Sequence, residues 1–143
     1  MKGIIFSIAA GLFISLQGVF NTRLGEKLCF WETNTFVHGT GFVLSLLLML
    51  IYGTGSFAGI GEVNRLYLTG GALGVMIIFS VMNAISALGA TYCIAVLLVT
   101  QLVAATVIDS FGLFGSPVIK FDITKLIGLA IMIGGIIVYK MKG

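Results

Sequence analysis

The sequence predicts an all-α membrane protein that crosses the bilayer with five helices. Of its 143 residues, 59% are hydrophobic and only 9% are charged, and the mean hydropathy is +1.17. A soluble domain carries about 25% charged residues, so this composition indicates a bilayer as the solvent. The stretch from Leu66 to Ile108 contains no charged residue. As a helix it would measure roughly 65 Å, about two bilayer thicknesses, so we expect it to reverse once.

Apolar runs of roughly 20 residues, the length that a spanning helix needs, set the five predicted spans. A polar segment, RLGEKLCFWETN, separates the first two, and a glycine-rich loop precedes Arg65. The uncharged stretch is expected to reverse near NAISALGA, where Asn83 and Gly89 lie. We predict a single transmembrane domain, residues 1–143, with spans at about 3–22, 35–53, 66–87, 90–112 and 124–140.

The beginning of the chain has features of a signal peptide, because Lys2 precedes an apolar run. The run continues to Val19, which is long enough to cross a membrane. We therefore expect a first helix that is retained.

Several function classes lack their sequence signatures. Cys29 and Cys93 have neither CxxC nor histidine-paired spacing, so no disulfide framework and no metal site is predicted. No HExxH motif or Ser/His/Asp set occurs, and GTGSFAGIG lacks the Lys-Ser/Thr ending of a phosphate loop. The net charge of +3 comes without a basic run. We expect no enzyme, no cofactor and no nucleic-acid partner.

The basic residues divide evenly between the two ends of five alternating spans. Loops rich in Lys and Arg normally stay cytoplasmic, so an even division leaves the orientation undetermined. Copies inserted both ways can pair antiparallel and recreate the inverted-repeat symmetry of many transporters. A paralogue of opposite orientation would serve as an alternative partner. One side receives Lys2, Arg65, Lys120 and Lys125, and the other receives Arg23, Lys27, Lys140 and Lys142.

Polar side chains within the spans predict a substrate pathway, because in lipid each must find a partner or line a water-filled cavity. In the fourth span Gln101 and Asp109 share one helical face. Each of these residues also has a purely structural interpretation. Gln17 and Gln101 could bond across a helix interface, His38 could lie at the membrane interface, and Asp109 could be a solvated residue at a helix end. The predicted pathway residues are Gln17, Asn21, His38, Asn83, Gln101 and Asp109.

Small residues in the spans predict close helix or subunit packing. Gly11 and Gly18 recur at a spacing of seven, and Gly70 and Gly74 form a GxxxG pair. Arg23 joins this group through a hypothetical cross-subunit contact. In an antiparallel pair it would share a membrane face with Asp109 of the partner subunit, which suggests an ion pair.

Three segments resemble the YdcZ-type family of the drug/metabolite transporter superfamily: LFISLQGVFNTRLG, FVHGTGFVLSL and ALGATYCIAVLLVTQLVAATVIDSFGLFG. The resemblance implies a five-helix unit, half of the superfamily's ten-helix inverted-repeat transporters. The shorter small multidrug resistance relatives work as antiparallel dimers and use a glutamate in the first helix for proton coupling. This chain has Gln17 in that neighbourhood and no acid. Any proton coupling would therefore need Asp109 or His38.

Together these features predict a small-solute transporter that works by alternating access as a dual-topology antiparallel homodimer. The alternative is a non-transporting membrane subunit or the heterodimer partner of another transporter-like protein. Membrane lipid and a small-molecule substrate are the other expected partners. The expected location is the bacterial cytoplasmic (inner) membrane, with several crossings.

Overall fold

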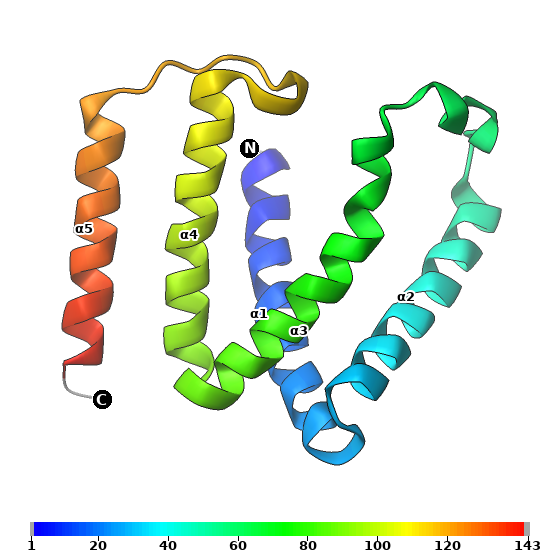
Figure 1. Cartoon of the computed structure of the whole chain (residues 1–143), viewed down its shortest axis with the longest axis horizontal. Coiled ribbons are helices and arrows are strands. Elements are labelled where there is room, and N and C mark those ends of the chain that lie inside the picture. Colours follow the sequence, from blue (N-terminus) through cyan, green and yellow to red (C-terminus); the bar gives the residue numbers. More distant parts are fainter. Residues whose placement is uncertain (1, 142–143) are drawn as a thin grey trace. The chain divides into compact units, whose positions relative to one another are not determined.

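Five long α-helices make up most of the chain (Figure 1). The computed structural model describes residues 2–141. Three short 3-10 helices lie in the connections, one pair between the second and third α-helices and one after the fourth. In chain order the elements are α1 (Lys2–Leu28), α2 (Phe30–Tyr52), η1 (Phe57–Glu62), η2 (Arg65–Thr69), α3 (Gly70–Leu88), α4 (Ala90–Phe111), η3 (Leu113–Gly115) and α5 (Ile123–Lys140).

Each of the five helices is long and apolar enough to cross a membrane, with η2 and α3 counted as one segment. Most of their large apolar side chains are exposed, as suits helices surrounded by lipid rather than water. The predicted all-α fold with five spanning helices is confirmed. The antiparallel homodimer stays a prediction.

The connection between α1 and α2 is shorter than the sequence suggested. The polar segment from Arg23 to Asn34 is helical on both sides of Cys29, which alone separates the two helices. Arg, Glu and Lys are good helix formers, and charged side chains are tolerated at a helix end near the headgroups. Arg23 and Glu26, one helical turn apart, form an ion pair at 2.9 Å that further stabilises the end of α1.

The helices divide into two compact units, which we describe separately. The first, Met1–Ala87, contains α1, α2 and all but the last residue of α3. Its buried residues come from the C-terminal halves of α1 and α3 and from the first turns of α2. Met82 of α3 is fully buried, and its methyl group would lie 2.5 Å from a Cβ added at Gly25. Glycine therefore makes room for the α3 side chain on α1.

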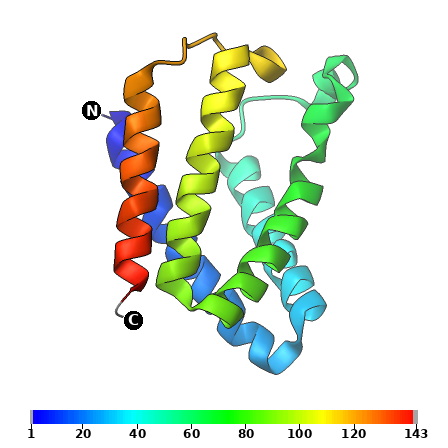
Figure 2. The same ribbon diagram turned by 60° about the vertical axis from the view of Figure 1, so that its left-hand side comes forward.

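In the second unit, Leu88–Gly143, α4 and α5 lie side by side and run in opposite directions (Figure 2). Gly112, with φ of 60°, ends α4 in a left-handed conformation. The chain then turns back, and the Ile119 amide donates to the Asp109 carbonyl oxygen at 2.9 Å. The Lys140 ammonium lies 4.3 Å from the centre of the Tyr92 ring, a cation–π contact between α5 and α4. The predicted single domain stays a prediction.

Candidate functional site

A group of polar residues is buried where α1, α2 and α3 meet. Asn21 and Thr22 of α1 are 6% and 7% exposed, and Thr33 and Asn34 of α2 are 0% and 3% exposed. Burying a polar group is costly unless it is hydrogen-bonded, so each of these side chains needs a partner. Thr22 has one in its own helix, because its hydroxyl donates to the Gly18 carbonyl oxygen at 2.8 Å.

Asn34 connects α2 to α3. Its Nδ2 donates to the backbone oxygen of Val75 at 2.8 Å, a bond between residues 41 positions apart. Such side-chain bonds between membrane helices contribute about 0.6 kcal/mol on average. The second polar atom of this amide, Oδ1, is buried and has no partner within residues 2–141. The Thr33 hydroxyl is likewise buried and without a hydrogen-bond partner within these residues. Two buried oxygen atoms can therefore accept hydrogen bonds.

His38 lies one turn after Asn34 on the same face of α2 and is half-buried. Its Nδ1 is 3.0 Å from the backbone oxygen of Asn34. Since a carbonyl oxygen only accepts, the hydrogen in this bond belongs to Nδ1. The other ring nitrogen, Nε2, faces α3, because a Cβ added at Gly74 would lie 3.0 Å from it. Only glycine allows the ring to approach α3 so closely.

Aromatic rings close this contact one turn before Asn34. Trp31 of α2 stacks on Phe79 of α3, with ring centres 4.9 Å apart and an interplanar angle of 9°. Phe30 meets the same Phe79 ring edge-on, with centres 5.9 Å apart. These rings cover the end of the α2–α3 contact with apolar surface.

The structure places the predicted pathway residues in different surroundings. Asn21 is buried and His38 is half-buried in the first unit, and Asp109 is half-buried in the second. Gln17, Asn83 and Gln101 are exposed, and the Asn83 amide donates to the Phe79 carbonyl oxygen of its own helix at 2.7 Å. Within residues 2–141, His38 is the one of these six residues that bonds to a member of the buried polar group, Asn34.

The predicted packing residues also differ from one another. Cβ atoms added at Gly18 and Gly74 would lie 3.0 Å from the nearest atoms, whereas Gly11 and Gly70 face open space. Arg23 pairs with Glu26, and both side chains are exposed. Exposed ion pairs are worth little, about 0.2–1 kcal/mol, so this pair could exchange for another. The contact of Arg23 with Asp109 of the partner subunit stays a prediction.

Thr33 and Asn34 are not among the predicted site residues, because the predicted second span begins at residue 35 and leaves them in the connection before it. One signal could have found them: Asn34 and His38 are four residues apart, the spacing of one helical face. Residues 2–141 bring together no three His, Cys, Asp or Glu side chains that could hold a metal ion.

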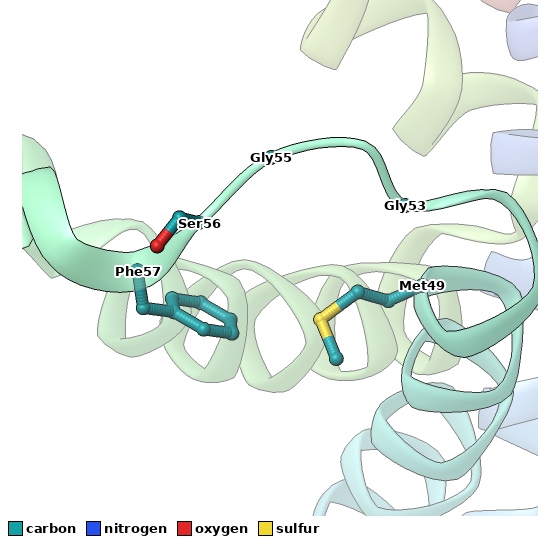
Figure 3. A pocket seen from close by; sticks show the side chains of 5 residues that line it. All are labelled: Met49, Gly53, Gly55, Ser56 and Phe57. Atoms are coloured by element: carbon teal, nitrogen blue, oxygen red, sulfur yellow. The ribbon is translucent and has the colours of Figure 1, made fainter.

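A hollow at the end of α2 lies apart from the polar group and is lined by Met49, Gly53, Gly55, Ser56 and Phe57. The Met49 and Phe57 side chains flank it beneath the loop (Figure 3). Its one polar side chain, Ser56, already accepts a bond from the Ala58 amide at 3.1 Å. This hollow offers no charged group to a ligand, so the polar group between α1, α2 and α3 is the stronger candidate site.

Comparison with known proteins gives one match. A family described as "Putative inner membrane exporter, YdcZ" matches residues 3–138. No curated protein and no solved structure matches the chain.

Proposed function

The chain belongs to the YdcZ family of inner membrane exporters, and from this premise we propose that it is a small-solute transporter working by alternating access as an antiparallel homodimer. Membership and the five spanning helices identify a multi-pass inner membrane protein of a transporter family rather than an enzyme family. Membership confirms the resemblance noted in the sequence. The dimer, its dual topology and the alternating access are the proposal.

The observation that carries the proposal is the even division of the basic residues. With five crossings, Lys2, Arg65, Lys120 and Lys125 lie on one side of the membrane. The opposite side receives Arg23, Lys27 and Lys140, together with Lys142, which lies outside the described residues. Because positive charge normally fixes orientation, this balance favours insertion in both directions.

The polar residues give such a dimer a passage. Gln17 and Gln101 lie in the middle of spanning helices and are exposed in one copy. An exposed amide inside a bilayer needs a protein partner or water. A second copy would supply either one, so we propose that Gln17, Asn21, His38, Asn83, Gln101 and Asp109 line the passage between two subunits. Thr33 and Asn34 join them, because their free oxygen atoms can accept bonds from a solute.

Cysteine labelling in intact cells tests the topology. Single cysteines would replace Ser56, in the loop before α3, or Met141, after α5, in a variant lacking Cys29 and Cys93. Five crossings put these positions on opposite sides of the membrane. With a dual topology, an impermeant maleimide labels about half of the copies at each position. Full labelling at one position and none at the other would refute the proposal.

Added charge provides the functional test. Lysines at Ser56 and Gly59 would orient every copy one way, and lysines at Glu32 and Met141 would orient every copy the other way. Each oriented variant should lose transport alone, and transport should return when both are co-expressed. Currents from proteoliposomes screened with metabolites and cations give the readout. Full activity of either oriented variant alone would contradict the antiparallel dimer.

A further inference from the structure

Three side chains of α2 form one stripe that faces α3. Trp31, Asn34 and His38 follow the spacing i, i+3, i+7, which places them on one side of a helix. Trp31 stacks on Phe79, Asn34 bonds to Val75, and His38 lies against Gly74. His38 is therefore one of three side chains of this stripe that contact α3, and it is the only one of the three that can change its charge.

The hydrogen bond to Asn34 determines which ring nitrogen can take up a proton. Nδ1 carries a hydrogen in both charge states, because its partner is a carbonyl oxygen. Nε2 is then the basic atom of the neutral ring, and it faces the backbone of α3 at Gly74. The neutral ring leaves one acceptor lone pair without a partner against Gly74, and an unpaired N–H group of the charged ring costs more. An added N–H group on the charged ring needs an acceptor or water, and Gly74 has no side chain that could accept its bond.

We propose that a proton binds at Nε2 of His38 and releases α3 from α2, so that this contact between the helices responds to pH. The proton adds to the Nε2 lone pair and gives an imidazolium, and no other bond forms or breaks in this step. The charged ring then requires water or an acceptor that Gly74 does not provide. Loss of the proton restores the contact. This inference goes beyond the proposed transport function.

The charged groups around His38 favour this assignment. Helix α3 contains no titratable residue at all. On α2 the other titratable groups are Glu32 and Tyr52, and on α1 they are Lys2, Arg23, Glu26 and Lys27; all are exposed. Within residues 2–141 the one ion pair joins Arg23 to Glu26. None of these charged groups is paired with His38 within residues 2–141.

The chain supplies its own probes, because His38 is its one histidine and Trp31 its one tryptophan. The experiment uses the full chain in liposomes of phosphatidylethanolamine and phosphatidylglycerol, with protons as the ligand. Solid-state NMR of histidine labelled with ¹⁵N reports the tautomer and protonation of His38. Trp31 fluorescence reports its stacking on Phe79. We expect the Nδ1–H tautomer at high pH, and a fluorescence change on acidification that follows the imidazole signal.

Two variants separate this mechanism from direct effects of pH on the fluorophore. H38Q keeps a hydrogen-bonding amide but cannot be charged, so the pH dependence of Trp31 emission should be lost. F79L keeps His38 but removes the stacked ring, so its emission should resemble that of the acidified wild type and stay constant with pH. D109N is the matched control and should respond as the wild type does.

The Nε2–H tautomer at high pH would overturn the proposal, as would wild-type emission that does not change while His38 titrates. An unchanged pH response in H38Q would overturn it as well. These readouts need neither a known solute nor a dimer. Failure of the topology experiment with an intact pH response would therefore contradict the proposed dimer and leave the His38 site supported.

Discussion

Two turns between consecutive helices of this protein consist of a single residue with nearly the same backbone conformation. Cys29, between α1 and α2, has φ of 63° and ψ of 175°, and Gly89, between α3 and α4, has φ of 79° and ψ of 158°. Each carbonyl oxygen accepts the first bond of the following helix, from Thr33 at 3.3 Å and from Cys93 at 3.2 Å. This region of backbone space is essentially restricted to glycine, so the turn at Cys29 is strained.

The difference between the turns lies in the residues that follow. After Cys29 the chain buries Thr33 and Asn34, and at the corresponding positions after Gly89 it carries Cys93 and Ile94. Strained residues persist only where the surroundings hold them, and they cluster at functional sites. The strained turn precedes a buried polar pair, of which Asn34 bonds to α3, and the relaxed turn precedes apolar residues. The comparison therefore supports a functional role for the first turn.

The largest effect is expected at the relaxed turn. Gly89→Ala places a side chain in the conformation that Cys29 already tolerates, so it should lower the free energy of unfolding by about 1–3 kcal/mol. Reversible unfolding in mixed detergent micelles at fixed protein concentration measures this. Gly128→Ala, in the interior of α5 with nothing within 4 Å of the added Cβ, is the control and should be neutral or stabilising. Equal stability of wild type and Gly89→Ala would mean that a side chain at this positive φ causes no measurable strain.

The next largest effect is expected at Asn34, the buried amide that follows the first turn and has no counterpart after the second. Asn34→Ala removes the bond to the Val75 oxygen, and such bonds between membrane helices contribute up to about 1.7 kcal/mol. Asn83→Ala is the matched control, because the Asn83 amide is exposed and bonds within its own helix. We expect a loss of about 1 kcal/mol for Asn34→Ala and a smaller one for Asn83→Ala in the same assay. A reversed order would remove Asn34 from the contact between the helices.

The fold was largely predictable from the sequence because apolar length alone identifies a spanning helix. The ends of the helices were not, since charged residues such as Arg23 and Glu26 continue a helix as readily as they end one. For the site, Asn21 and His38 were identified as polar residues in apolar helices. Their partners were not, because Asn34 meets Val75 across 41 residues and no local pattern encodes that contact. For exposed residues such as Gln17, a contact with a second copy of the chain is equally absent from any local sequence pattern.

Thr33 offers a third test, of similar size and opposite sign. Its buried hydroxyl has no partner within residues 2–141, and an unsatisfied buried polar atom costs about 1–3 kcal/mol. Thr33→Val keeps the shape and removes that atom, so it should raise the free energy of unfolding by about 1 kcal/mol. Cys93→Ser introduces a hydroxyl at the corresponding position after Gly89 and should lower it by a similar amount. A loss of stability in Thr33→Val would show that the hydroxyl is bonded to water or a solute.

The smallest effect is expected from making the two turns alike. Cys29→Gly relieves the backbone strain, and about 0.5–1 kcal/mol of that gain is offset because glycine loses more conformational entropy on folding. The net rise in the free energy of unfolding should therefore be about 1 kcal/mol or less. Cys29→Ala removes the thiol but keeps the side-chain strain, so it should match the wild type. If the Gly and Ala variants are equally stable, the surrounding packing and not the backbone conformation distinguishes the first turn, and the strain has no share in holding Asn34 against α3.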